Sequence, residues 1–143
     1  MKLFIAFILL ALPIQWEPNF ENAKKTAKEK HELILLNFSG SDWCGPCILF
    51  RRDYLENEAF GQMAADHLVL VNADFPRKKK NTGSPDVVAR NKALAEIYNK
   101  EGSFPLTLLL DADGKVIKTW HGKPDAPVAQ WTAEIKAICD ARK

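Results

Sequence analysis

The apolar residues of this chain fall into short continuous runs that alternate with stretches of helical spacing. Residues 33–38, 68–73 and 106–110 are mostly apolar, as strands are when both of their faces are buried. Between these runs, apolar residues recur every three or four positions, which is the spacing of one face of a helix. The pattern therefore predicts an α/β domain in which helices cover both faces of a sheet.

Four helices follow from this spacing, one before the first strand and three after it. The residues expected on their inner faces are, in chain order, Phe20, Ala23, Ala27 and His31; Ile48, Arg51, Tyr54 and Leu55; Val87, Asn91, Leu94 and Tyr98; and Val128, Trp131, Ile135 and Ile138. We expect the second helix to begin at Cys44, with the head group of Arg51 extended into solvent. The third helix closes at Gly102, and the last has Asp125 as its cap and Pro127 in its first turn.

The connections set the order of these elements. The helix that begins at Cys44 carries the chain across to residues 68–73, so the first two strands are parallel. Asp113 and Gly114, which separate residues 106–110 from residues 116–120, indicate a hairpin. The predicted order is therefore strand, helix and strand, followed by a helix, a hairpin and a final helix.

Residues 75–86 show neither a continuous apolar run nor apolar residues at helical spacing. We call this segment the basic loop. Residues 77–80 are four consecutive cations, and residues 81–85 read Asn-Thr-Gly-Ser-Pro, which is typical of a loop. Such a run either binds an acidic partner or a lipid head group or is merely solvated, and we favour the solvated interpretation. It lacks the aromatic residues that alternate with cations in nucleic-acid grooves, so no nucleic-acid partner is expected.

The main candidate for chemistry lies between the first strand and the second helix, where residues 44–47 read Cys-Gly-Pro-Cys after Trp43. This spacing puts one sulfur at the first turn of a helix and the other one turn deeper. Unpaired backbone N–H groups and the helix dipole favour the thiolate of Cys44, the form that attacks disulfides. Cys47 is within reach of the mixed disulfide and resolves it by exchange. Pro46 suits the first turn because it lacks an N–H.

Two cysteines at this spacing are also half of a zinc site. A tetrahedral site needs about four ligands, and the other candidates, Cys139, His31, His67 and His121, are not paired at ligand spacing. The dithiol interpretation is therefore favoured, and no metal site is predicted. Cys139 stands four residues after Ile135 on the last helix, so we interpret it as a small buried hydrophobe rather than a third redox thiol.

Residues 38–47, which read Phe-Ser-Gly-Ser-Asp-Trp-Cys-Gly-Pro-Cys, resemble the active-site segment of the thioredoxin family. Residues 102–110 are similar to the family's cis-proline segment at the start of a strand. Residues 74–78 and the insertion after them look most like secreted bacterial members. The resemblance covers residues 16–143 and implies a thioredoxin fold, with a central mixed sheet of about four to five strands flanked by helices on both faces.

The resemblance implies a thiol-disulfide oxidoreductase that exchanges electrons with protein disulfides through Cys44 and Cys47, as a net reductase or isomerase. Electrons pass between thiols, so no cofactor beyond its own disulfide is needed. The expected partners are proteins with disulfides and a membrane thiol-disulfide electron donor, and the chain is expected to be a monomer. The alternative is a non-catalytic thioredoxin-fold module that binds a peptide, or Cu(I) through both thiolates with His121 as an added ligand.

The same resemblance implies a substrate groove beside the dithiol. In the family, the proline of the second segment is cis and faces the two cysteines, so Pro105 is expected to be cis. The backbone of Phe104, the preceding residue, would then pair with an extended substrate strand. Trp43, Gly45 and Pro46 are expected to line the groove with them.

The chain departs from the family at one buried position. Thioredoxins carry a carboxylate in the strand before the motif that is proposed to shuttle the proton of the deeper cysteine, whereas this chain has Asn37. An amide cannot take up that proton, so we expect the Cys47 proton to leave through water or a less direct route and its exchange to be slower. Asp42, beside Cys44, is expected to raise the pKa of that thiol by like-charge repulsion.

The N-terminus has a different character. Lys2 is followed by the apolar residues 3–12 and then Pro13, which is the layout of a signal peptide, assigned here to residues 1–15. The apolar stretch is shorter than the roughly 20 residues of a membrane-spanning helix. We therefore expect export, for instance to the periplasm, with an uncleaved anchor as the rival. Residues 16–143 then form one thioredoxin-like domain, and the chain's 47% hydrophobic and 27% charged residues fit such a domain.

Overall fold

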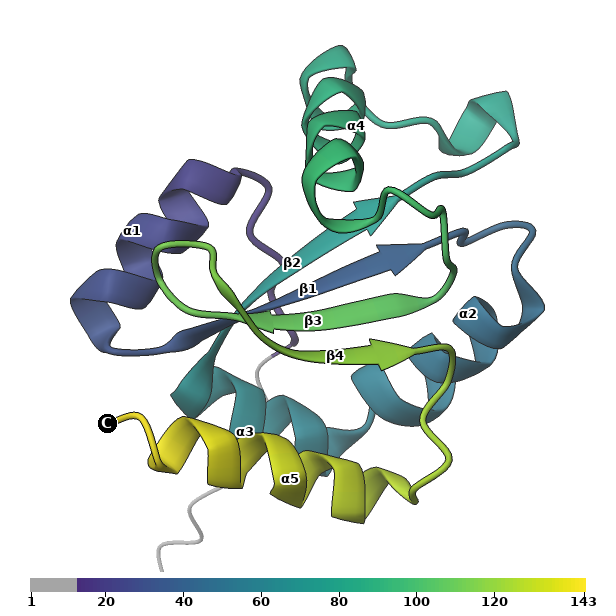
Figure 1. Cartoon of the computed structure of the whole chain (residues 1–143). Coiled ribbons are helices and arrows are strands. Elements are labelled where there is room, and N and C mark those ends of the chain that lie inside the picture. The colour runs from purple at the N-terminus through teal and green to yellow at the C-terminus, as the bar shows by residue number, and fades with distance from the viewer. Residues whose placement is uncertain (1–12) are drawn as a thin grey trace, which may run out of the picture.

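The computed structural model of the chain describes residues 13–143 (Figure 1). Its elements in chain order are α1 (Phe20–Lys30), β1 (Leu33–Ser39), α2 (Gly45–Phe50), the π-helical turn η1 (Arg51–Leu55), α3 (Glu58–His67), β2 (Leu68–Asp74), the 3-10 turn η2 (Lys79–Asn81), α4 (Pro85–Tyr98), β3 (Leu106–Leu110), β4 (Val116–His121) and α5 (Val128–Asp140). The predicted signal peptide lies outside the described residues except for its last three positions. None of the described helices is long and apolar enough to cross a membrane.

The strands form one mixed sheet in the order β2-β1-β3-β4. β1 runs parallel to β2 and antiparallel to β3, and β3 pairs with β4 as a hairpin. The predicted parallel pair and hairpin are therefore confirmed. Phe38 near the end of β1 lies opposite Leu106 at the start of β3. The segment that follows β1 and the segment that precedes β3 consequently meet at one edge of the sheet.

Helices cover both faces of the sheet (Figure 1). α1 and α4 lie on one face, and α2, α3 and α5 lie on the other. Along β1, Leu33 and Leu35 point toward α3 and α5, whereas Ile34, Leu36 and Phe38 point toward α1 and α4. Every residue of β1 is buried, which explains why this strand reads as a nearly continuous apolar run.

The core beneath α5 is organised around Trp131. This side chain is fully buried, and its ring lies 5.3–5.7 Å, centroid to centroid, from the rings of Phe50, Tyr54, Phe60 and Trp120. These contacts join α5 to the end of α2, to α3 and to β4. The helix that carries the second cysteine of the motif therefore rests on a packed aromatic base.

The helix after the motif differs from the prediction in its inner face. Ile48 is 47% exposed and Arg51 is exposed, whereas Phe50 and Leu55 are buried. A regular helix that buries Leu55 also buries the positions four and seven residues earlier, which are Arg51 and Ile48. The π-helical turn η1 instead spaces its hydrogen bonds five residues apart, so Leu55 and Phe50 reach the core together.

One helix, α3, has no counterpart among the predicted helices. Asn57 is its N-cap, and the side-chain Oδ1 accepts hydrogen bonds from the backbone N–H groups of Ala59 and Phe60 at 3.0 and 3.3 Å. Its buried residues recur at helical spacing: Phe60, Met63, Ala64 and His67. A capping asparagine followed by this spacing is a start signal that the sequence contains.

The ends of the last two helices also correct the prediction. α5 begins at Val128 with Pro127 as its N-cap and no side-chain cap, so the assignment of Asp125 as the cap is wrong. α4 ends at Tyr98, and Gly102 lies in the turn beyond it. Cys139 on α5 is 4% exposed, as expected for a small buried hydrophobe, and this burial raises the pKa of its thiol to about 11.

Candidate active site

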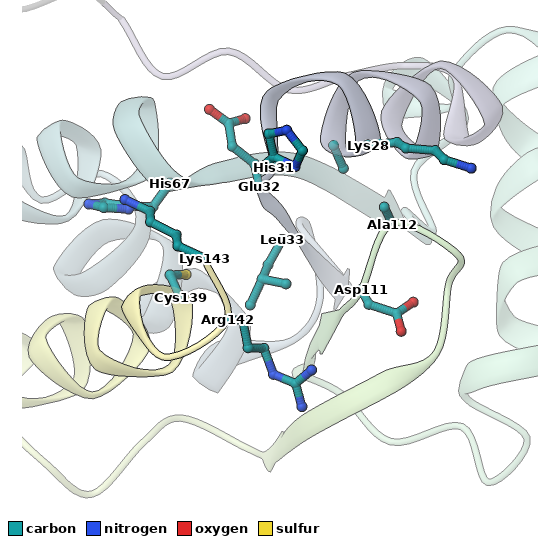
Figure 2. A pocket seen from close by; sticks show the side chains of 11 residues that line it. Lys28, His31, Glu32, Leu33, His67, Asp111, Ala112, Cys139, Arg142 and Lys143 are labelled. Atoms are coloured by element: carbon teal, nitrogen blue, oxygen red, sulfur yellow. The ribbon is translucent and has the colours of Figure 1, made fainter.

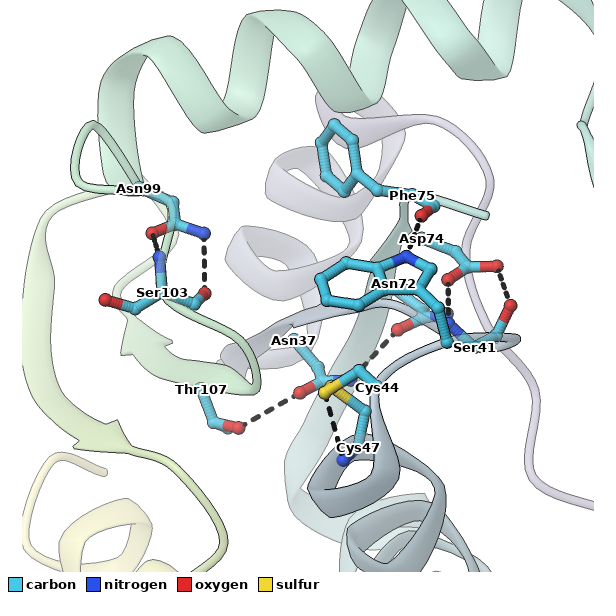
Figure 3. Close-up of a disulfide and its surroundings, with 11 residues drawn as sticks. Asn37, Ser41, Cys44, Cys47, Asn72, Asp74, Phe75, Asn99, Ser103 and Thr107 are labelled. Atoms are coloured by element: carbon cyan, nitrogen blue, oxygen red, sulfur yellow. Dashed lines mark hydrogen bonds between the residues drawn. A yellow bond between two sulfur atoms is a disulfide. The ribbon is translucent and has the colours of Figure 1, made fainter. Parts of the chain in front are cut away.

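The two cysteines of the motif lie where β1 ends and α2 begins (Figure 3). Cys44 is the N-cap residue of α2, Cys47 lies in its first turn, and the two sulfurs form a disulfide. The backbone N–H of Cys47 donates a hydrogen bond to Sγ of Cys44 at 3.3 Å. A donor directed at this sulfur stabilises its thiolate once the disulfide is reduced.

The two cysteines differ in accessibility. Cys44 is 6% exposed and Cys47 is 2% exposed. Cys44 was expected to face solvent, and it is the more exposed of the two, but both are largely covered in the disulfide form. Gly45 and Pro46 are exposed, and a Cβ atom added at Gly45 would meet nothing within 4 Å. The open space over Gly45 leaves room for a second chain next to Cys44.

Trp43, the residue before the first cysteine, is held in a fixed position. Its indole Nε1–H donates a hydrogen bond to the backbone carbonyl of Phe75 at 2.7 Å. On the other side, the ring packs directly against Gly40, where a Cβ atom would lie only 2.3 Å from Cε2 of the indole. The position of Trp43 therefore requires glycine at residue 40. Gly40 is part of the segment that resembles the thioredoxin family, but no role was predicted for it from the sequence.

Phe104 and Pro105 approach the motif from the start of β3. The ring centroid of Phe104 lies 5.4 Å from that of Trp43 and 5.6 Å from that of Phe75, in edge-to-face geometry in both cases. The Phe104–Pro105 peptide bond is cis, and the carbonyl of Pro105 accepts a hydrogen bond from the N–H of Gly122 at 2.8 Å. The two sequence segments that resembled the thioredoxin family thus meet at the same edge of the sheet.

Asn37 occupies a buried polar position in β1 close to the motif. Its Nδ2 donates to Oδ1 of Asn72 at 3.0 Å, and its Oδ1 accepts from Oγ1 of Thr107 at 3.1 Å (Figure 3). Asn37 is 3% exposed and Thr107 is fully buried. Both ends of the amide are hydrogen-bonded, and it offers no group that could accept a proton, as expected from the sequence.

A polar cavity of about 290 Å³ extends to this amide from the side of α4 and η1. Its polar lining residues are Glu17, Asn37, Ser39, Arg51, Asn72, Asp74, Arg90 and Asn91. A polar space of this size has room for several water molecules, each with hydrogen-bonding partners. Water can therefore reach Asn37, although neither cysteine lines this cavity, and the water route for the Cys47 proton stays a prediction.

Asp42 binds the basic loop rather than standing as an isolated charge beside Cys44. Its carboxylate accepts hydrogen bonds from the backbone N–H groups of Arg77 and Lys78, both at 2.9 Å, and from Nδ2 of Asn81 at 3.0 Å. The bond from Arg77 is the largest of the effects that lower the pKa of Asp42 to about 2. The loop therefore stabilises the negative charge of Asp42, and the expected rise of the Cys44 pKa through this charge stays a prediction.

The first cation of the basic loop lies on the motif itself. The guanidinium carbon of Arg77 is 4.0 Å from the centroid of the Trp43 ring, a distance typical of a cation–π contact. The interpretation of the four cations as merely solvated is thus wrong for Arg77. The contact could not be found from sequence, because it depends on the hydrogen bonds that fold the loop back onto Asp42 and Trp43.

Two apolar side chains are exposed on α2 next to the cysteines. Ile48 is 47% exposed and Leu49 is 40% exposed. These residues were not predicted to be at the surface, since Ile48 was assigned to the core. His121, considered as a copper ligand, is exposed at the end of β4 opposite Leu106.

A second cavity, of about 230 Å³, lies at the opposite end of the sheet from the cysteine pair (Figure 2). Its lining includes Lys28, His31, Glu32, His67, Asp111, Cys139, Arg142 and Lys143. Burial raises the pKa of the Glu32 carboxyl above its ordinary value, and Nδ1 of His67 has no hydrogen-bond partner. Across residues 13–143, no three His, Cys, Asp or Glu side chains are grouped so that they could hold a metal ion.

The chain is similar to known thiol-disulfide proteins. The family model described as thioredoxin-like matches residues 15–112. The disulfide bond reductase DsbH of Chlamydia pneumoniae is 31% identical over 134 residues, which cover 94% of this chain and 78% of DsbH. A solved structure of a DsbH oxidoreductase has a TM-score of 0.83 at 30% identity and covers 99% of this chain and 95% of its own.

A more distant structural match is a thioredoxin from Thermus thermophilus. Its TM-score is 0.65 at 15% identity, and the match covers 90% of this chain and 88% of the thioredoxin. At this identity the match concerns the fold alone. Together with the four-stranded mixed sheet and the helices on both of its faces, these similarities confirm the fold predicted from the sequence.

Proposed function

Because this chain belongs to the thioredoxin-like family, we propose that its Cys44–Cys47 pair reduces disulfides in other proteins. The chain is a thiol-disulfide oxidoreductase, since it matches a disulfide bond reductase over nearly its whole length. The observation that carries the proposal is the pair itself. It forms a disulfide where β1 meets α2, with a backbone N–H donated to Cys44 and open space over Gly45.

In the proposed reaction, Cys44 is the nucleophile and Cys47 is the resolving cysteine. The thiolate of Cys44 attacks one sulfur of the substrate disulfide, so that a mixed disulfide forms while the other substrate sulfur leaves and takes up a proton. Cys47 then loses its proton and attacks Sγ of Cys44. The second substrate sulfur leaves as a thiol, the Cys44–Cys47 disulfide closes, and the substrate has gained both electrons.

The proton of Cys47 needs an acceptor during the second step. Asn37 cannot serve as one, since its amide is neutral and fully hydrogen-bonded. We assign this role to water in the polar cavity that extends to Asn37. Resolution is then slower than it would be with a buried carboxylate, because water is a weak base at neutral pH.

The substrate is proposed to bind as an extended strand beside the disulfide. Phe104 and Pro105 directly precede β3, at the end of the sheet where β1 leads into the cysteine motif, and supply the backbone for pairing. Trp43, Gly45 and Pro46 form the facing side of the same groove, and Trp43 contacts Phe104 directly. The exposed apolar residues of α2 extend this surface.

The pair must be reduced again after each cycle. We propose a membrane thiol-disulfide carrier as the donor, whose own dithiol is oxidised as Cys44 and Cys47 are reduced. Such a donor fits an exported, periplasmic protein, as the predicted signal peptide at residues 1–15 requires. Residues 16–143 then act as one monomeric thioredoxin-like domain, and electrons move from thiol to thiol without a further cofactor.

Insulin reduction tests the proposal directly. Reduced wild-type protein with a dithiol donor should precipitate the insulin B chain, and Cys44→Ser should lose all turnover. Cys47→Ser should instead accumulate a covalent mixed disulfide that mass spectrometry detects, while Cys139→Ser, the matched control, should behave as wild type. Undiminished turnover in Cys44→Ser, or a mixed disulfide formed through Cys47, would contradict the assigned roles.

A further inference from the structure

The basic loop is held against the cysteine motif at several points. Asp42 accepts two backbone N–H groups and one side-chain amide from the loop. The N–H of Phe75 donates to the carbonyl of Ser39 at 2.8 Å, and the carbonyl of Phe75 accepts from the indole of Trp43. Asp42 and Trp43 are the two residues directly before Cys44. The loop is therefore attached to the active site through the motif's own residues.

In the described part of the chain, the four cations of this loop form no close ion pair. Within residues 13–143, the ion pairs of the chain do not include Arg77 or the three lysines that follow it. Asp42 is hydrogen-bonded to backbone and amide N–H groups of the loop, and its charge also interacts with that of Lys78. Four exposed cationic side chains thus lie on a loop that is bonded to the residues directly before Cys44.

Arg77 connects this charge to the substrate groove. Its guanidinium stacks on the Trp43 ring at 4.0 Å, and Trp43 in turn contacts Phe104. A guanidinium that stacks on an aromatic ring keeps its N–H donors free at its edges, where they can bind a carboxylate with two parallel hydrogen bonds. A chain that lies along Phe104 with its cysteine at Cys44 passes within a few residues of these donors, since a strand advances about 3.3 Å per residue.

The opposite flank of the disulfide is different in character. The two side chains directly after Cys47 are apolar and exposed, Ile48 at 47% and Leu49 at 40%, and charged residues follow only in η1. The surface around the pair is therefore asymmetric, apolar along α2 and positively charged along the loop. The hydrogen bonds to Asp42 and the stacking of Arg77 on Trp43 hold this run next to the motif, while the lysine side chains themselves stay exposed.

We propose that the basic loop is part of the substrate site and selects protein disulfides whose cysteine is followed or preceded, within a few residues, by Asp or Glu. This inference rests on the proposed function of the Cys44–Cys47 pair. The carboxylates of such a substrate bind Arg77 and the neighbouring lysines, while the cysteine lies over Gly45. Opposite charges accelerate the encounter and suppress disulfides flanked by cations.

The test compares two peptides that differ only in charge. Each has one cysteine in a disulfide with 2-mercaptoethanol, flanked on both sides by two Glu residues in one peptide and by two Lys residues in the other. Stopped-flow fluorescence gives the bimolecular rate constant with the reduced protein. We expect the acidic peptide to react about tenfold faster at 50 mM salt, with a ratio that falls to about threefold or less at 500 mM, because salt screens exposed charges.

Two variants with equal loss of charge localise the effect. The triple substitution Lys78→Gln, Lys79→Gln and Lys80→Gln keeps the backbone bonds to Asp42 and the stacking of Arg77, and should lower the ratio clearly below the wild-type value. The triple substitution Lys25→Gln, Lys28→Gln and Lys30→Gln on α1, where these lysines are exposed, should keep the wild-type ratio. Equal ratios in both variants would mean that only net charge matters and would overturn the proposal.

If the loop variant does not fold, the ratio of the two rate constants measured with the wild type still tests the proposal. A wild-type ratio near one at low salt overturns the proposal, whereas reduction of bis(2-hydroxyethyl) disulfide, which is neutral, shows in the same preparation that the redox function is intact. Failure with all three disulfides would instead count against the function of the pair. Binding to anionic phosphatidylglycerol vesicles together with a ratio near one would identify the loop as a lipid contact and not a substrate contact.

Discussion

Replacing Asn37 by Asp should speed the resolution step while it destabilises the fold in a pH-dependent way. The new carboxylate keeps the hydrogen bond from Thr107, since Oγ1 of that residue donates to it at 3.1 Å. In the wild type, Oδ1 of Asn72 accepts a hydrogen bond from Asn37 at 3.0 Å. A carboxylate at position 37 cannot donate, so the half-buried Asn72 amide has to turn and present its NH2 group to it. The remaining cost is the desolvation of a charge at a position that is 3% exposed.

The size of this cost follows from the pKa of the new acid. Burial raises the pKa of a carboxyl group, and a rise of about two units above the unfolded value of about 3.9 corresponds to about 2.7 kcal/mol. Below about pH 4 the group is protonated in both states and no such cost arises. Because the native state binds the proton more tightly, the loss of stability grows by about 1.4 kcal/mol per pH unit up to about pH 6 and then stays constant.

Urea unfolding of the oxidised proteins measures the thermodynamic part. The stability difference between wild type and Asn37→Asp should be about 2.2 kcal/mol larger at pH 8 than at pH 4, where the unfolded carboxyl group is already half ionised. For the kinetic part, reduced protein is mixed with excess disulfide, and the concentration-independent phase gives the rate of resolution. That rate should increase in Asn37→Asp at pH 7 to 8, where the carboxylate can take up the Cys47 proton.

Asn37→Leu is the matched control for this experiment. It removes the partner of Thr107 and Asn72 without adding a base, so it should destabilise the fold by about 1 to 3 kcal/mol at either pH and leave resolution no faster than in wild type. If Asn37→Asp resolves the mixed disulfide no faster than wild type, the lack of a base at position 37 does not limit the resolution step. If its stability loss is the same at pH 4 and pH 8, the position does not disfavour a charge.

Two further predictions concern the surroundings of the pair, and a third concerns Cys139 on α5. Gly40→Ala should cost about 1 to 3 kcal/mol in urea unfolding, because its Cβ would lie 2.3 Å from the Trp43 ring, whereas Gly45→Ala, where nothing lies within 4 Å, should change stability by less than about 1 kcal/mol. The pKa of Asp42, lowered from 3.8 to about 2, means that its contribution is present above pH 4 and is lost as pH falls through 2. The difference in Tm between wild type and Asp42→Asn should therefore shrink between pH 4 and pH 2, and a constant difference would show that the charge is immaterial. In the oxidised protein, Cys139 should react with iodoacetamide at pH 8 about a hundredfold more slowly than an unhindered thiol, since burial raises its pKa from 9.0 to about 11; a rate equal to that of free cysteine would contradict the burial.

The elements that could be predicted from sequence are those whose burial repeats regularly. β1 is buried on both faces over its whole length, and its nearly continuous apolar sequence follows directly from this burial. The helix after the motif could not be predicted in detail, because its register changes where α2 becomes η1. That change lets Phe50 and Leu55 both face the core, and Phe50 packs on Trp131, which is distant in sequence.

In the active site, too, some features could be predicted from the sequence and others could not. The cysteine pair could be predicted because its chemistry depends on residues adjacent in sequence. The role of Asp42 could not, since its partners are backbone N–H groups 35 and 36 residues away, and backbone groups carry no sequence signal. Arg77 was misjudged for the same reason, because its contact with Trp43 exists only once those bonds have folded the loop.

The buried amide and the basic loop act on different steps of one reaction. The loop meets the substrate before any bond forms, so its charges change the bimolecular encounter. Asn37 is buried between Asn72 and Thr107 and does not touch the substrate, so it changes only the closing of the disulfide. A slow second step extends the lifetime of every mixed disulfide, and an unsuitable partner then occupies Cys44 for that whole time. We therefore infer that selection at the encounter matters more in this chain than in a thioredoxin with a buried acid, and the loop lies where such selection takes place.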